Sequence, residues 1–227
     1  MNPVKAVVDL LIPKSCFGCS KPSANALCDN CIASFKFIGP THCLKCGYPT
    51  ILEVNSCGQC RGKGFRFREG RSLLFYEGIV KDILLSLKLE SGFALADSLA
   101  RMAIREMEKD FFDVCAFTFV PSTAWKKFTR GHNAAELIAK SLAHRLKIPL
   151  IDTLDFQKKV RDQAALEAGA RQENLKGAFK VKRDIDVKGP VMIVDDIFTS
   201  GATLKEASRA LAKANVKTKV FTLARTL

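Results

Sequence analysis

Residues 191–203, which decide the fold, read Val-Met-Ile-Val-Asp-Asp-Ile-Phe-Thr-Ser-Gly-Ala-Thr. The first four are apolar and three of them are branched aliphatics, a run that predicts a fully buried strand. Asp195 and Asp196 follow at the end of this strand, and a helix is expected to begin near Thr203 after a turn with hydroxyl groups and a glycine. This order places backbone N–H groups and the positive end of a helix dipole where an anion can bind.

The two carboxylates need a role of their own, because they would repel an anion bound beside them. Hydrogen bonding to the vicinal hydroxyls of a ribose is such a role, as an acid does in dinucleotide-binding folds. The stretch therefore predicts a site for a ribose 5-phosphate. The alternative is an ordinary strand–turn–helix connection in which Asp196 or Thr199 caps the helix. A Walker loop is excluded, since no Gly-Lys-Ser/Thr follows.

Length and composition indicate a globular protein. At 227 residues the chain is long enough for one ordinary domain and a small module, and its 48% hydrophobic and 26% charged residues argue against disorder. No apolar run approaches the ~20 residues of a membrane helix. The run Val4–Ile12 is interrupted by Asp9 and lacks the cleavage pattern of a signal peptide. We therefore expect a cytoplasmic protein without membrane insertion.

Positive charge is concentrated near the N-terminus. The net charge is +13, and residues 1–68 hold nine Lys and Arg against three Asp and Glu. A polyanionic partner such as nucleic acid is one explanation, and a generally basic protein is the other. Five phenylalanines lie among these cations, where they would either stack on single-stranded bases or form a small core: Phe17, Phe35, Phe37, Phe65 and Phe67.

Eight of the nine cysteines form four Cys-x-x-Cys pairs. Each pair can offer two thiolates to one tetrahedral zinc, and two pairs complete a closed structural site. We expect two structural Zn²⁺ ions, bound by the first pair with the second and by the third with the fourth; an interleaved pairing is the alternative. Disulfides compete with this interpretation, but a reducing cytosol disfavours them. The ligands are Cys16, Cys19, Cys28, Cys31, Cys43, Cys46, Cys57 and Cys60.

Beyond Gly62 and Gly64, segments with strand and helix patterns alternate. Strands are expected at 71–76, 114–120, 149–154, 177–181, 190–194 and 217–223, the last of them closing the sheet, and helices at 79–89, 93–108, 133–146 and 203–214. This alternation predicts a parallel, doubly wound α/β sheet. We expect a small zinc module over residues 1–68 and the α/β domain over residues 69–227.

Further anion contacts are expected near the carboxyl ends of other strands. Ser122 follows the strand that ends at Val120, and Arg130 stands where the next helix opens, although a surface charge would also explain this arginine. The long polar segment 158–175 carries Arg161, and such segments are either lids over a ligand or flexible surface loops.

Residues 195–203 resemble the phosphoribosyl-pyrophosphate (PRPP) loop of type I phosphoribosyltransferases, and the whole chain resembles the ComF family of competence-associated proteins. The chain differs from the usual family pattern at His132-Asn133-Ala134 and at Asp162. The motifs that carry the resemblance are the four cysteine pairs, Tyr76-Glu77-Gly78, Leu87-Lys88, Val120-Pro121, Arg130-Gly131-His132-Asn133, Arg161-Asp162-Gln163, Gly177-Ala178-Phe179 and the 195–203 stretch.

The resemblance implies a type I phosphoribosyltransferase-like fold with an N-terminal double zinc ribbon, and binding of PRPP with Mg²⁺. In that family pattern Asp195 and Asp196 hold the ribose hydroxyls. The 5-phosphate contacts would be Thr199, Ser200, Gly201, Ala202 and Thr203, and the pyrophosphate contacts would be Ser122, Arg130 and Arg161. The resemblance assigns a catalytic role to Asp195, Asp196 and Arg161.

Two functions remain open at this point. One is a PRPP-binding protein that handles single-stranded DNA in the cytoplasm during natural competence, with proteins of the DNA-uptake machinery as partners. The other is an active phosphoribosyltransferase of nucleotide metabolism, in which an unidentified nitrogen acceptor displaces pyrophosphate from PRPP.

Overall fold

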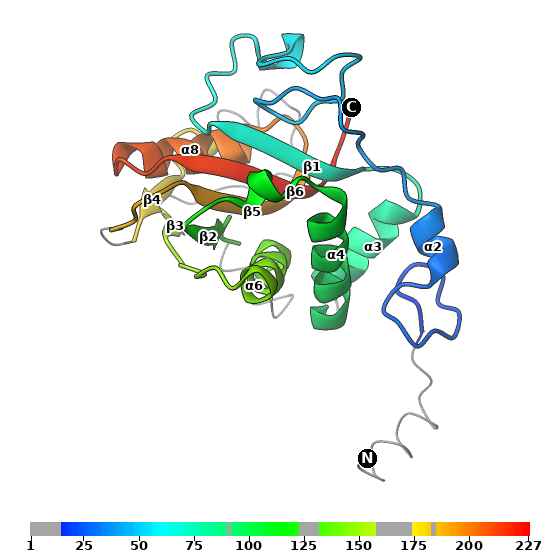
Figure 1. Cartoon of the computed structure of the whole chain (residues 1–227). Coiled ribbons are helices and arrows are strands. Elements are labelled where there is room, and N and C mark those ends of the chain that lie inside the picture. The colour runs from blue at the N-terminus through cyan, green and yellow to red at the C-terminus, as the bar shows by residue number, and fades with distance from the viewer. Residues whose placement is uncertain (1–14, 90–91, 123–131, 158–173, 183–184) are drawn as a thin grey trace.

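The computed structural model describes residues 15–89, 92–122, 132–157, 174–182 and 185–227. Its centre is a four-stranded sheet in the order β1-β6-β5-β2, in which all neighbouring strands are parallel (Figure 1). The strands are β1 (Glu69–Phe75), β2 (Ala116–Phe119), β5 (Val191–Phe198) and β6 (Thr218–Arg225). The expected parallel α/β sheet is thus confirmed.

Helices cover both faces of the sheet. One face carries α3 (Ile79–Leu89), α4 (Phe93–Glu106) and α6 (Ala134–Leu146), and the other carries α8 (Ala202–Lys213) (Figure 1). Among the described residues there are also short helical elements, which include α2 (Asp29–Ala33) and the 3₁₀ turns η1 (Gly58–Cys60) and η2 (Lys109–Phe112). No helix in these described ranges has the length and apolar character needed to cross a membrane.

Strand β5 is buried on both faces, as its apolar run predicts. Met192 and Val194 belong to the apolar cluster on the α3, α4 and α6 side, and Val191 and Ile193 belong to the cluster under α8. This alternation follows from the two-residue repeat of a strand. The strand continues to Phe198, so the two acids lie within it and not after it.

Two expectations about the sheet are wrong. β6 does not close the sheet but lies between β1 and β5, where parallel pairing on both sides satisfies its backbone. The segment 149–154 gives one bridge, Leu150 with Phe117, while β3 (Leu154–Phe156) and β4 (Phe179–Val181) form a separate antiparallel pair. Burial on one side only, as at Leu154 and Phe179, suits antiparallel pairing better than a central position in a parallel sheet.

The two cysteine-rich ribbons pack on opposite faces of the sheet. Cys16 and Phe35 of the first ribbon (residues 15–35) join the apolar cluster around α3 and α4. Cys46 and Phe67 of the second ribbon (residues 41–67) join the cluster under α8. β1 begins at Glu69, next to the expected boundary at residue 68, but the ribbons share their cores with the sheet, and the division into two domains stays a prediction.

The segment between the ribbons and the second ribbon also cover β1, the edge strand of the sheet. Ile38 donates its N–H to the Leu73 carbonyl, and Phe75 donates to the Lys36 carbonyl, both at 3.0 Å. The Gly70 N–H bonds the Leu44 carbonyl of the second ribbon at 3.1 Å. An open edge exposes unpaired N–H and C=O groups, so these contacts protect it.

Glycine is required where the second ribbon meets β1. A Cβ on Gly70 would lie 2.8 Å from Val220 Cγ2 and 3.0 Å from the Lys45 carbonyl oxygen. Replacement of Gly70 by alanine is therefore expected to lower the free energy of unfolding by about 1–3 kcal/mol through overpacking. Urea unfolding measures this loss. Gly39→Ala is the control, since no described atom lies within 4 Å of its added Cβ. Equal stability of the two variants would contradict the close docking.

Candidate functional site

The connection between β5 and α8 leads from the carboxyl end of the strand into a helix N-terminus. Residues Thr199 to Gly201 join the two elements, and Gly201 is the N-cap with a φ of +75°, in the left-handed region that favours glycine. No side chain of the cap accepts a hydrogen bond, and the first turn of α8 holds no acidic residue. The first N–H of the helix, that of Ala202, contacts Ser200 Oγ at 3.4 Å, a distance longer than a typical hydrogen bond, and a helix N-terminus of this kind favours an anion. This geometry rules out Asp196 or Thr199 as the helix cap.

The two predicted acids lie side by side at the carboxyl end of β5. Asp195 accepts the Asp196 N–H at 2.9 Å, and Asp196 accepts the Ile197 N–H at 2.8 Å. Burial, followed by the negative charge of Asp196, raises the pKa of Asp195 well above its usual value. Lys88 of α3 opposes this rise, and its Nζ lies 2.6 Å from Asp196 Oδ2.

Lys88 was not predicted as a site residue, although it belongs to the Leu87-Lys88 motif. It stands in the last turn of α3, next to the fully buried Leu87. His132 holds this end of the helix, because its Nε2 lies 2.8 Å from the Leu87 carbonyl oxygen. A basic residue in the last turn of the helix was the available signal, but its partner is set by tertiary packing.

Ser122 lies at the same end of the sheet as the acids. The Val120 N–H bonds the Val194 carbonyl at 3.0 Å, so the end of β2 adjoins the residue before Asp195. Asn133 caps α6 and donates its Nδ2 to the Val120 carbonyl at 2.8 Å, which fixes the start of this helix beside the strand. Arg130 and Arg161 lie outside the described residues.

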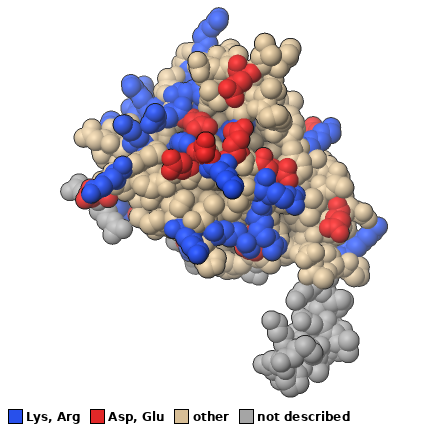
Figure 2. Space-filling view, in the orientation of Figure 1, with Lys and Arg blue, Asp and Glu red and all other residues tan. Residues whose placement is uncertain are grey.

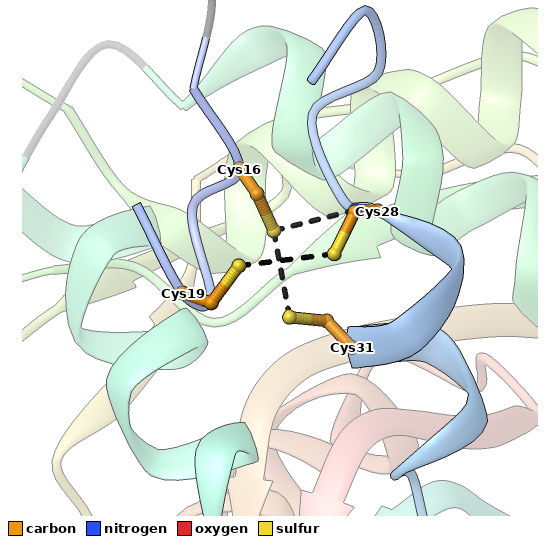
Figure 3. A group of neighbouring side chains, drawn as sticks. All are labelled: Cys16, Cys19, Cys28 and Cys31. Atoms are coloured by element: carbon orange, nitrogen blue, oxygen red, sulfur yellow. Dashed lines mark hydrogen bonds between the residues drawn. The ribbon is translucent and has the colours of Figure 1, made fainter. Parts of the chain in front are cut away.

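The cysteines form two compact tetrads, one in each ribbon. The Sγ atoms within each tetrad all lie within 4.8 Å of one another, with Cys16–Cys31 at 3.6 Å and Cys19–Cys28 at 3.8 Å (Figure 3). Tetrahedral thiolates about 2.3 Å from a zinc ion lie roughly 3.8 Å apart, whereas a disulfide needs about 2 Å. The sequential pairing is therefore confirmed, and both tetrads fit structural zinc with no open coordination position.

Backbone N–H groups support the thiolate form of one cysteine in each tetrad, Cys16 and Cys43, whereas burial raises the pKa of Cys31 and Cys46. Burial raises the pKa of the Cys16 thiol, but donors that include the N–H groups of Cys28 and Gly18 outweigh it and lower the pKa to about 6. Both of these donors lie 3.3 Å from Cys16 Sγ. In the second tetrad the Cys57 N–H approaches Cys43 Sγ at 3.2 Å. These bonds orient the sulfur ligands and favour the charge state that binds metal.

The phenylalanines of the ribbons serve mainly as core and docking residues. Phe35 and Phe67 are buried, and Phe17, Phe37 and Phe65 are half-buried against the two apolar clusters. The basic residues Arg61, Arg66 and Arg68 remain exposed. On the face shown in Figure 2, basic and acidic side chains are interspersed, so the excess positive charge does not form one continuous patch there.

Two domain families match the sequence. The double zinc ribbon domain matches residues 7–61, which include all eight ligands, and the phosphoribosyl transferase domain matches residues 132–225, which include the β5–α8 connection. A match to the crystal structure of an adenine phosphoribosyltransferase covers 60% of this chain and 69% of the transferase chain, at 16% identity. Its TM-score of 0.36 is too low to support the domain match.

Curated relatives match over nearly the whole chain. Competence protein F of Haemophilus influenzae is 28% identical over 89% of this chain and 91% of its own length. Competence protein ComFC of Streptococcus pneumoniae is 24% identical over 88% of both chains. The DNA utilization protein YhgH of Salmonella typhimurium is 27% identical over 96% of this chain and all of its own. The chain is thus similar over nearly its whole length to the ComF-type competence proteins, and it combines a double zinc ribbon domain with a phosphoribosyl transferase domain.

Proposed function

We propose that the protein binds PRPP with Mg²⁺ at the β5–α8 connection. The observation that carries this proposal is the order of groups at one end of the sheet: two adjacent carboxylates in β5, a left-handed Gly201 and the N-terminus of α8, whose first turn holds no acidic residue. The match of residues 132–225 to the phosphoribosyl transferase domain supports the same ligand class.

Each part of PRPP has a proposed contact. The 5-phosphate accepts N–H groups and hydroxyls between Thr199 and Thr203, where the helix dipole favours negative charge. The ribose hydroxyls donate to Asp195 and Asp196. Ser122, at the neighbouring strand end, contacts the pyrophosphate, together with Arg130 and Arg161. Mg²⁺ bound to the ligand neutralises part of the pyrophosphate charge.

Transfer chemistry is the second candidate, and the acid pair favours it. A nitrogen acceptor would form a bond to C1 of the ribose while the C1–O bond breaks, and pyrophosphate would leave with the bonding electrons. Positive charge develops on the ribose in such a step, and the carboxylates of Asp195 and Asp196 would stabilise it.

We also propose that the protein handles single-stranded DNA in the cytoplasm, with proteins of the DNA-uptake machinery as partners. The names of the relatives, two competence proteins and a DNA utilization protein, support this role. The exposed basic residues Arg61, Arg66 and Arg68 lie on one short segment at the end of the second ribbon and provide cations for a phosphate backbone.

The double variant Asp195→Asn with Asp196→Asn is expected to lose at least about tenfold in PRPP affinity, because the amides replace charged acceptors for the ribose hydroxyls. Titration calorimetry with PRPP and MgCl₂ measures the loss. Asp155→Asn is the matched control, since this strand carboxylate also accepts the N–H of the next residue, at 2.8 Å. Absence of PRPP binding by the wild type, or equal binding by the double variant, would refute the site.

Removal of the Lys88 charge is expected to change the pH dependence of PRPP binding. In Lys88→Met the pKa of Asp195 rises further, because Asp196 then faces it without the opposing cation. Asp195 therefore ionises only at a higher pH in this variant. In a plot of PRPP affinity against pH, the acid limb should move upward by on the order of one pH unit. Lys88→Arg should keep the wild-type profile, and Lys81→Met on the same helix is the control. An unshifted profile for Lys88→Met would contradict the role.

Single-strand binding should depend on the basic segment. Replacement of Arg61, Arg66 and Arg68 by alanine is expected to weaken binding of a labelled oligonucleotide. The slope of log affinity against log salt should fall by about 2, because each lost cation contributes about 0.7. The exposed residues Lys140, Lys147 and Lys213 give a control triple variant of equal charge. The segment has no role if both triple variants lower the slope equally.

A further inference from the structure

The second ribbon touches the phosphate loop, defined as residues 199–202. A Cβ added to Gly201 would lie 2.6 Å from Phe198 Cζ and 2.9 Å from Phe65 Cε1, so the backbone of this glycine rests on two phenyl rings. Phe198 belongs to β5, and Phe65 belongs to the second ribbon. The two rings meet edge to face with centroids 6.1 Å apart. The left-handed turn of the loop is therefore held partly by the ribbon.

Phe65 is itself fixed by the buried part of the second ribbon. Its ring stacks on Phe67 with centroids 4.8 Å apart, and Phe67 is fully buried in the cluster under α8. Lys63, two residues earlier, places its Nζ 3.5 Å from the Ser200 carbonyl oxygen. Two contacts from one short segment thus reach consecutive residues of the phosphate loop.

Arg225 makes a second connection between this ribbon and the loop. It is the last residue of β6, its side chain is only 3% exposed, and it lies opposite Phe198 in the sheet register. Its guanidinium lies 4.9 Å from the ring centroids of both Phe198 and Tyr48. Its Nη1 donates to the carbonyl of the zinc ligand Cys46 at 2.7 Å. A buried cation thus joins the second tetrad to the ring beneath Gly201.

The first ribbon has different neighbours. It packs beside the start of α3, where a Cβ on Gly18 would lie 2.9 Å from Ile79 Cδ1. Phe37, between the two ribbons, contacts the edge strand β1 through its bridge to Leu74. The ring centroids of Phe37 and Phe35 lie 6.2 Å apart. Phe37 is half-buried like Phe65, which makes the two residues a matched pair for comparison.

We propose that the second zinc ribbon positions the phosphate loop, through Phe65 and Arg225, and thereby sets the affinity for the 5-phosphate of PRPP. The proposal rests on the proposed function of this loop. Phe65 and Arg225 are positioning residues, since they act through Phe198 and Gly201. A loop already held in its binding geometry loses less conformational entropy when the phosphate binds, which strengthens binding without an additional ligand contact.

The test compares Phe65→Ala with Phe37→Ala in the full-length, zinc-loaded chain. Calorimetry with ribose 5-phosphate reports on the phosphate loop, and calorimetry with magnesium pyrophosphate reports on the rest of the site. Phe65→Ala is expected to raise the Kd for ribose 5-phosphate about tenfold by loss of preorganisation, with little change for pyrophosphate. Phe37→Ala should change neither Kd, and Phe65→Tyr should restore wild-type binding because it keeps the ring.

A second variant tests the inference in case Phe65→Ala does not fold. Lys63→Ala removes one contact from the partly exposed surface of the ribbon, and it is expected to raise the Kd for ribose 5-phosphate by about threefold through loss of a favourable charge near the loop. The inference would be overturned if both Phe65→Ala and Lys63→Ala bound ribose 5-phosphate with wild-type affinity. It would also be overturned if Phe65→Ala and Phe37→Ala weakened the binding of ribose 5-phosphate and of pyrophosphate equally. Lack of PRPP binding by the wild type would instead overturn the proposed function.

Discussion

Two adjacent carboxylates lie within the carboxyl-terminal half of a buried parallel strand, and their mutual repulsion constrains the groups around them. Burial raises the pKa of Asp195, and the negative charge of Asp196 adds to this effect. Lys88, on one side of the sheet, forms an ion pair with Asp196 at 2.6 Å and offsets part of this repulsion. The N-terminal turn of α8 contains no acidic residue and so adds no negative charge. These positive groups lie where the ribose and phosphate of the proposed ligand would be bound.

The zinc ribbons have a structural role as well, because β1, the strand that follows them in the chain, lies at the edge of the sheet. Backbone bonds from Lys36, Ile38 and Leu44 cover that edge, and each ribbon extends one of the two apolar clusters. A module this small buries too little surface to fold without metal or a partner surface. Zinc binding, edge protection and the position of the phosphate loop are therefore parts of one arrangement.

Local sequence patterns predicted much of this structure. The apolar spacing of 79–89 gave a helix with the observed bounds of α3, and the cysteine spacing gave both tetrads. The order of strand, acids, glycine and helix located the candidate site. The central position of β6 and the separate β3–β4 pair were missed, because the lateral order of strands depends on contacts between distant segments. The Lys88–Asp196 and Arg225–Cys46 contacts were missed for the same reason, since no local sequence pattern identifies which distant residue a side chain will contact.

The central claim is that residues 195–203 hold a ribose 5-phosphate, and a crystal structure of the zinc-loaded chain with MgCl₂ and PRPP tests it most directly. The account predicts the 5-phosphate at the N–H groups between Thr199 and Thr203, with the ribose hydroxyls on Asp195 and Asp196 and the Lys88–Asp196 ion pair rearranged or broken. Density for PRPP at another place in the molecule, or a β5–α8 connection without ligand at saturating PRPP, would contradict it.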